Sequence, residues 1–201
     1  MSSYSLKKLS VPFATPLSEK LKEGCKIIIH GTVRSHIEDT FEVEFLVGGN
    51  VALHLSFQFH HEGNHLILNS ISEGNWGVEK KVKNPLHEGD EFHLTIQVSA
   101  KHYNIELLGK PLAEFKHRIP FDTVQAVGVK GGVELKSVQF QGFPFATTWD
   151  ENAHGKNSYE GYGTSSYTPP VGKTVMQIAQ LAMIMDKNLL NQQLAATNEK
   201  L

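Results

Sequence analysis

Residues 41–47 read FEVEFLV, and residues 92–98 read FHLTIQV. In both stretches large apolar side chains largely alternate with polar ones, which is the period of a β-strand with one buried face. The alternation recurs from residue 11 to about residue 145, and no helical pattern interrupts it. We therefore expect these residues to form strands that each turn one face toward a core.

Turn signals interrupt the alternation at short and regular spacing. Each contains glycine, and they lie at residues 48–50, 62–64, 73–75, 87–90, 109–111 and 130–132. Many short strands joined by tight turns are typical of an antiparallel sandwich or barrel. The sequence predicts an all-β fold, an antiparallel two-sheet β-sandwich over residues 11–145 that follows an N-terminal segment of residues 1–10.

The composition changes abruptly at the end of the predicted sandwich. Residues 146–172 are poor in aliphatic side chains and rich in Gly, Ser and Tyr, which predicts a linker. An amphipathic α-helix is predicted over residues 173–201 from apolar residues at three- and four-residue steps, namely Val175, Ile178, Ala182, Met185 and Leu189. Two alternatives stay open for this helix: docking on the sandwich, or pairing with a second copy in a homo-oligomer.

Length, charge and cysteine content exclude several classes of protein. The 201 residues suit one domain with an appendage, and the single cysteine, Cys25, excludes an intramolecular disulfide framework and a thiolate zinc site. The net charge of −2, with acids and bases interspersed, argues against nucleic-acid binding. No stretch has the length of a signal peptide core or a membrane span, so we expect a cytosolic chain without membrane insertion.

One predicted strand, residues 53–59, reads LHLSFQF. Its even positions carry His54, Ser56 and Gln58, so one face of the strand is a row of hydrogen-bonding groups. Such neutral donors and acceptors suit a polyhydroxylated ligand, because each hydroxyl both donates and accepts. A solvated outer face gives the same alternation. The row alone leaves both interpretations open.

Further candidate residues follow downstream: Asn69, then Trp76 directly after a Gly-Asn turn, then Glu79 and Lys81. We expect Trp76 to be partly exposed, and its rigid face can cover the apolar C–H face of a pyranose. Taken singly, Trp76 could anchor a loop in the core, and Asn69 and Glu79 could be an ordinary turn residue and a surface charge.

The order and spacing of these residues resemble the galectin family. Its members carry His-x-Asn-x-Arg, then Val-x-Asn, then Trp-Gly-x-Glu-x-Arg. The corresponding stretches here are His54-x-Ser56-x-Gln58, Ile67-x-Asn69 and Trp76-Gly77-x-Glu79-x-Lys81. The resemblance covers residues 11–143 and implies a galectin-type jelly roll. It further implies a lectin for β-galactoside glycans on glycoproteins or glycolipids that needs no cofactor and performs no catalysis.

The resemblance also implies roles for individual residues. Trp76 would stack on galactose, His54 would contact its axial hydroxyl, and Asn69 and Glu79 would bind further hydroxyls. Three positions depart from the family, because Ser56 replaces Asn, Gln58 replaces the first Arg and Lys81 replaces the second. A neutral amide and a flexible ammonium hold Glu79 less firmly than two guanidinium groups would. We expect affinity to be weakened by about tenfold, or specificity to be altered.

Three other functions compete with this interpretation. Glycoside hydrolysis needs two carboxyl groups, and only Glu79 falls in the expected groove. Crowded histidines suggest a metal site, but they lack an acidic or thiolate partner at a recognised spacing; they are His54, His60, His61 and His65. A galectin fold that has lost sugar binding and serves as a protein-interaction module remains the alternative. Resemblance implies a cytoplasmic protein that can reach the extracellular side by leaderless secretion.

Overall fold

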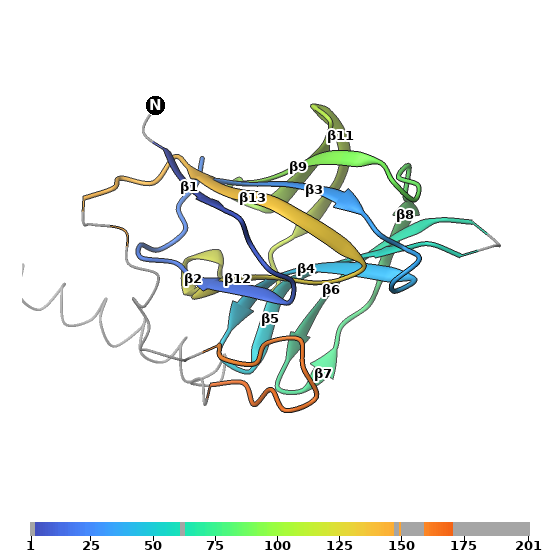
Figure 1. The fold of residues 1–201 in the computed structure, drawn as a ribbon. Coiled ribbons are helices and arrows are strands. Elements are labelled where there is room, and N and C mark those ends of the chain that lie inside the picture. Colours follow the sequence, from blue (N-terminus) through green and yellow to red (C-terminus); the bar gives the residue numbers. More distant parts are fainter. Residues whose placement is uncertain (1–2, 61–62, 147–148, 150–158, 171–201) are drawn as a thin grey trace, which may run out of the picture.

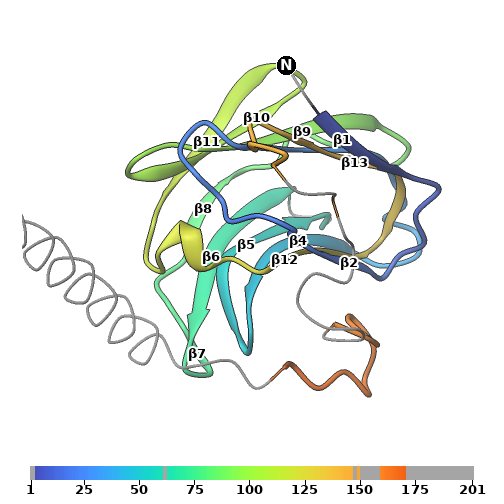
Figure 2. The same cartoon turned by 90° about the vertical axis from the view of Figure 1, so that its left-hand side faces the viewer.

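The computed structural model describes residues 3–60, 63–146, 149 and 159–170. They form two antiparallel sheets packed face to face, which confirms the predicted sandwich (Figures 1 and 2). The six-stranded sheet has the order β1 (Ser3–Lys7), β13 (Val133–Gln141), β3 (Lys26–Val33), β9 (Glu91–Val98), β10 (His102–Leu107) and β11 (Lys110–Lys116). The seven-stranded sheet has the order β2 (Phe13–Pro16), β12 (Ala126–Gly131), β4 (Thr40–Val47), β5 (Asn50–Gln58), β6 (His65–Ser72) and β7 (Asn75–Trp76), with β8 (Lys80–Lys83) also paired to β6.

The alternating strands bury one face each between the two sheets. On β4 the side chains of Phe41, Val43 and Phe45 are buried in the core. The ring of Phe41 stacks on Phe57 of β5, with centroids 4.5 Å apart, and on Phe92 of β9, with centroids 5.1 Å apart. Since β9 belongs to the other sheet, this aromatic stack joins the two layers through the core.

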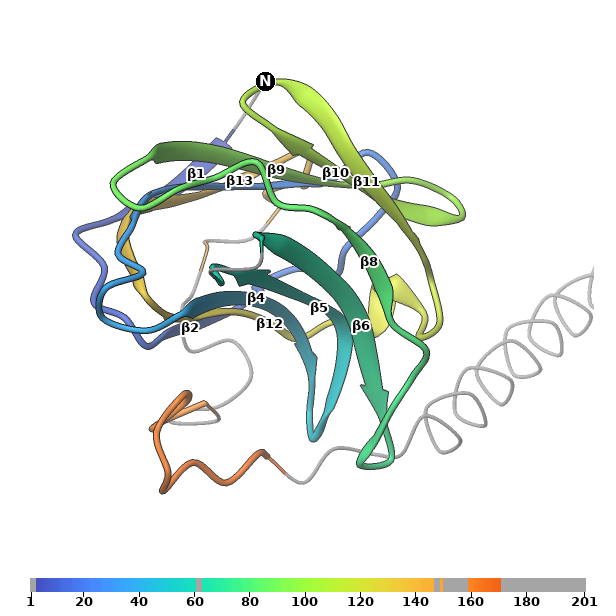
Figure 3. The same ribbon diagram turned by 90° about the vertical axis from the view of Figure 1, so that its right-hand side faces the viewer.

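The opposite face of the seven-stranded sheet, which we call the outer face, is concave (Figure 3). The side chains of Glu42 and Glu44 on β4, and of His54, Ser56 and Gln58 on β5, point to it because side chains alternate along a strand. The register is irregular between Val51 and His54, which places Ala52 in the core. The segment Tyr159–Pro170 lies on the same side of this sheet, as Figures 1 and 3 show in orange. The outer face is therefore bounded by this segment and by the turn that carries β7.

The termini differ from the pattern that alternation alone suggests. Strand β1 falls within the predicted N-terminal segment and pairs with β13 along its whole length. The described residues contain one short 3-10 helix, η1 (Phe121–Thr123), and no α-helix. No helix among the described residues is long and apolar enough to cross a membrane. The helix predicted over residues 173–201, and self-association through it, lie outside the described residues.

The aromatic stack predicts a large difference between two neighbouring phenylalanines. Phe57 is fully buried, whereas Phe59 is only partly buried at the margin of the core. We expect Phe57→Ala to lower the free energy of unfolding by about 3–5 kcal/mol because it leaves a cavity between the sheets. Urea unfolding should show this loss with an unchanged slope, and Phe59→Ala should cost clearly less. Equal losses in the two variants would contradict the assigned role of the stack.

Candidate functional site

Strand register brings the polar residues of the outer face into two rows. One row crosses four strands through Gly128, Glu44, His54 and Asn69. The next row runs through Lys130, Glu42, Ser56, Ile67 and Lys81. Residues far apart in the chain thus become neighbours on one surface, and the acidic residues of β4 lie beside the polar row of β5.

A cavity of about 320 Å³ opens on this surface. Six of the seven predicted site residues line it: His54, Ser56, Gln58, Asn69, Trp76 and Glu79. Lys81 does not. It is exposed on β8 and lines a neighbouring cavity that also includes Gln58. The sequence therefore predicts most of one common site, while the ammonium of Lys81 stands at its margin.

His54 is fixed from two sides. Its Nδ1 lies 2.9 Å from Glu44 Oε1, and its ring meets the ring of Trp76 edge to face, with centroids 4.8 Å apart. Because an ionised carboxylate only accepts, Nδ1 must carry the proton that is shared with Glu44. In the neutral ring, Nε2 is then the free acceptor. The imidazole is 7% exposed, so its orientation is set by protein contacts.

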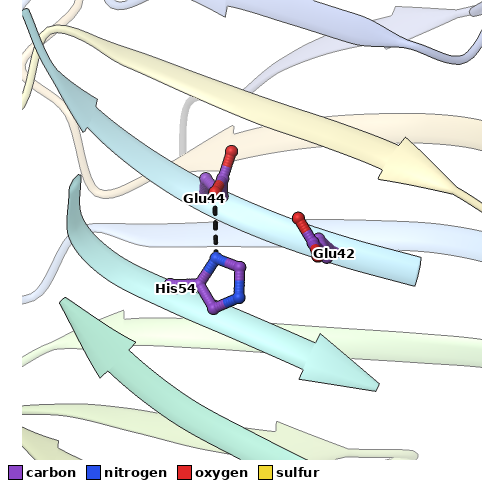
Figure 4. A group of neighbouring side chains, drawn as sticks. All are labelled: Glu42, Glu44 and His54. Atoms are coloured by element: carbon purple, nitrogen blue, oxygen red, sulfur yellow. Dashed lines mark hydrogen bonds and ion pairs between the residues drawn. The ribbon is translucent and has the colours of Figure 1, made fainter. Parts of the chain in front are cut away.

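The carboxylate of Glu44 is buried and has three partners (Figure 4 shows its bond to His54). Besides His54, it accepts a hydrogen bond from the hydroxyl of Tyr162 and one from Lys130 Nζ at 3.2 Å. Burial alone would raise the pKa of Glu44, but the hydrogen bond from His54, the charge of Lys130 and the hydrogen bond from Tyr162 lower it to about 2. Glu44 is therefore a permanent anion at neutral pH.

Glu42, Glu44 and His54 also form a possible metal-ligating group, since each offers a ligand atom and these atoms lie within 4.8 Å of one another (Figure 4). Lys130 Nζ already occupies this group, at 2.9 Å from Glu42 Oε2 and 3.2 Å from Glu44 Oε2. Its ammonium supplies the positive charge that a metal ion would bring. The arrangement is thus better described as an internal ion-pair network than as a metal centre.

Asn69 is 2% exposed and holds the turn that carries Trp76. Its Nδ2 donates to the carbonyl of Gly77 at 3.0 Å, and its Oδ1 accepts from Arg118 Nη1 at 3.0 Å. Arg118 also donates to the carbonyl of Val78. A Cβ atom at position 77 would lie 2.4 Å from Arg118 Nη1, so a larger residue there would displace this guanidinium from Asn69. Asn69 keeps one N–H for a ligand.

The remaining lining residues present free polar groups. Trp76 is 55% exposed, as expected from its place after the turn, so a broad apolar face is available. Among the described residues, no hydrogen bond or ion pair engages the side chains of Ser56, Gln58 or Glu79. The site therefore combines one apolar platform with several unused donors and acceptors. Such a combination suits a ligand that carries several hydroxyl groups.

The sequence alone does not predict four residues that shape the site: Glu42, Glu44, Arg118 and Tyr162. The carboxylates of β4 alternate with apolar residues and look like an ordinary solvated face. Only strand register places them beside the polar row. Arg118 and Tyr162 reach the site from distant segments, and no local pattern marks them.

Comparison with known proteins gives a consistent result. Residues 12–140 match the family model described as galactoside-binding lectin. The chain is 36% identical over 170 residues to the probable galaptin lec-8 of Caenorhabditis elegans, covering 84% of this chain and 93% of that protein. It is 35% identical over 170 residues to the probable galaptin lec-7 of the same organism, covering 84% and 94%.

The fold is also similar to that of a solved structure. The crystal structure of Caenorhabditis elegans galectin LEC-6 superposes with a TM-score of 0.63 at 22% identity, covering 68% of this chain and 94% of that one. The two alignments with lec-8 and lec-7 span 170 residues, more than residues 1–140 contain. Similarity to these relatives therefore continues into the segment after the sandwich.

The low pKa of Glu44 predicts an acid-sensitive contribution to stability. Because the folded-state value of about 2 lies below the ordinary value of 4.5, the stabilisation is complete above pH 4.5 and is lost as the pH falls toward 2. For wild type this part of the loss should be about 3 kcal/mol. Urea unfolding from pH 6 to pH 2 should show a shallower decline in Glu44→Gln, which begins less stable. Parallel curves for the two proteins would refute this assignment.

Proposed function

Because the chain belongs to the galactoside-binding lectin family, we propose that its outer face binds β-galactoside-containing glycans and releases them chemically unchanged. The observation that carries the proposal is the gathering of six predicted residues around one cavity beside an exposed Trp76. These residues come from three strands and the turn before β8.

The cavity offers the chemistry that a sugar needs. A pyranose presents hydroxyls at its edge and C–H groups on its face. His54 Nε2, the Gln58 amide and the Glu79 carboxylate can receive or share hydroxyl protons, while the indole of Trp76 covers the C–H face. The edge-to-face contact between Trp76 and His54 fixes the angle between the apolar platform and the hydrogen-bonding edge. We propose that galactose lies in this angle.

The carboxylates of the site favour binding over hydrolysis. A glycosidase needs a carboxylic acid that is protonated near neutral pH and a second carboxylate across the scissile bond. Glu44 has the opposite property, with a pKa of about 2. Glu42 lines the cavity but is ion-paired with Lys130. The anions of β4 therefore support neighbouring side chains and leave no proton donor among them.

We expect a modest affinity, because Glu79 lacks a guanidinium partner. Gln58 lines the cavity as a neutral amide, and Lys81 lies at its margin. A charge-assisted hydrogen bond contributes about 1.5–3 kcal/mol, against about 1 kcal/mol for a neutral one. One missing charged contact corresponds to weaker binding, with a dissociation constant about tenfold larger.

The first test concerns Trp76. We expect Trp76→Ala to weaken lactose binding by tenfold or more, because truncation removes the apolar platform. Glycan-array binding with lactose competition would measure the loss. Trp149→Phe is the matched control, since Trp149 packs against Tyr4 and Phe140 away from the site. It also leaves Trp76 as the sole tryptophan, whose fluorescence should change with lactose.

Folded wild-type protein that binds no glycan on the array would overturn the proposed function. Binding that depends on Trp76 but resists lactose would keep a lectin and replace its preferred ligand. Circular dichroism shows independently whether the protein is folded, so loss of binding can be told apart from unfolding.

A second test introduces arginine at positions 58 and 81, where the galectin motif carries it. We expect the double variant Gln58→Arg, Lys81→Arg to bind lactose up to about tenfold more tightly, because planar guanidinium groups can brace Glu79 and donate to a hydroxyl. Titration calorimetry would measure the dissociation constants. Lys80→Arg is the control, as Lys80 donates to the carbonyl of Glu114 instead of facing the cavity. If the double variant gained nothing over the control, the explanation for modest affinity would fail.

A further inference from the structure

The segment Tyr159–Pro170 packs on the outer face beside the proposed glycan site. Tyr159 and Tyr162 are buried in a second apolar cluster with Leu46, Val51 and Ala126. The hydroxyl of Tyr159 donates to Gln125 Oε1 at 3.1 Å. Figure 3 shows the segment in orange at one end of the concave surface, with β7 at the other. Its composition resembles a linker, but two of its tyrosines serve as anchors.

The sheet contains a seat for one of these anchors. A Cβ atom at Gly128 would lie 2.5 Å from Tyr162 Cζ, so a larger residue on β12 would displace the ring. Gly128 pairs with Glu44 across the strands. The glycine therefore leaves room for the outer end of the phenol to approach the sheet, where its hydroxyl reaches the Glu44 carboxylate. The side chain of Tyr162 is left only 5% exposed.

From these contacts we infer that Tyr162 is a positioning residue of the glycan site. It donates to Glu44 Oε2, while Glu44 Oε1 holds the Nδ1 of His54. The hydroxyl thus fixes the second oxygen of the carboxylate that orients the imidazole. Removing it leaves Lys130 Nζ, at 3.2 Å, as the remaining partner of that oxygen among the described residues, so the carboxylate is held less firmly. This inference rests on the proposed function, since His54 is taken to meet the sugar.

The same segment also shapes the surface next to the site. A cavity of about 470 Å³ lies between the sheet and the segment, lined by Glu42, Lys130, Tyr162, Thr164 and Tyr167 among others. Glu42 lines this cavity and the glycan cavity alike. The segment therefore bonds Glu44 directly, and Glu42, two residues away on the same face of β4, lines both cavities. Docking of the segment and the arrangement of the site are physically connected.

The test compares two phenol-to-phenyl changes in the full chain. Tyr162→Phe removes the hydroxyl that bonds Glu44, and Tyr159→Phe removes the hydroxyl that bonds Gln125. Ring ¹⁵N resonances of His54, identified by their loss in His54→Gln, report its hydrogen bonding without any ligand. We expect Tyr162→Phe to shift these resonances and to weaken lactose binding three- to tenfold. Tyr159→Phe should leave the resonances in place and affinity within twofold.

Gly128→Ala provides an independent route, because it blocks the seat while Tyr162 keeps its hydroxyl. It should shift the His54 resonances in the same direction as Tyr162→Phe. A purely structural role for the segment would lower the melting temperature in these variants without moving the His54 ring signals. Unchanged signals in both folded variants would overturn the inference.

Failure of the proposed function would be distinct from failure of this inference. If wild-type protein bound no galactoside, the glycan assignment would fail. The His54 resonances would still decide whether Tyr162 positions the imidazole, because they are read in the free protein.

Discussion

The carboxylate of Glu44 is the point on which the outer face depends. A buried anion is costly unless charges and hydrogen bonds compensate it. Here the compensation comes from three other segments: His54 on β5, Lys130 on β12 and Tyr162 in the C-terminal segment. Each partner lowers the pKa of Glu44 from its own segment, so the anion links strand register to the orientation of the imidazole. A neutral side chain of the same size would pack there without imposing that order.

The site divides into a rigid half and an open half. In the rigid half, His54 and Asn69 are almost fully covered and already hold protein partners. In the open half, Trp76 and Glu79 are exposed. Binding to the rigid half costs little conformational entropy, because its side chains are already ordered. The exposed side chains of the open half must be ordered on binding. Discrimination among sugars should therefore come from the covered residues, and adaptability from the exposed ones.

Alternation along the chain predicts the sandwich and most of its strands, because burial on one face of a sheet demands period two; β1 lies before the alternating region. It also predicts the polar row of β5, whereas Trp76 is recognised from its place after a Gly-Asn turn and from the galectin-type motif. Residues whose role depends on pairing across strands could not be predicted this way. Glu44 reads as solvated until register sets it against His54. Tyr162 lies in a stretch whose composition predicts a linker, and its packing on the sheet depends on the space above Gly128 and on its bond to Glu44, which the sequence does not show.

The site lacks arginine at positions 58 and 81, but it has other charged groups nearby, among them Glu44 and Arg118. The galectin motif carries arginine at the two positions that Gln58 and Lys81 occupy here. In this chain the only guanidinium that contacts the described site is Arg118, which holds Asn69 and the turn after Trp76 from behind. The other fixed charges, Glu44 and Lys130, lie on the opposite flank of His54. Arg118, Glu44 and Lys130 do not line the cavity themselves, so their charges act by holding the side chains that do. Such support orders the site before a sugar arrives, but adds no charged contact once it is bound.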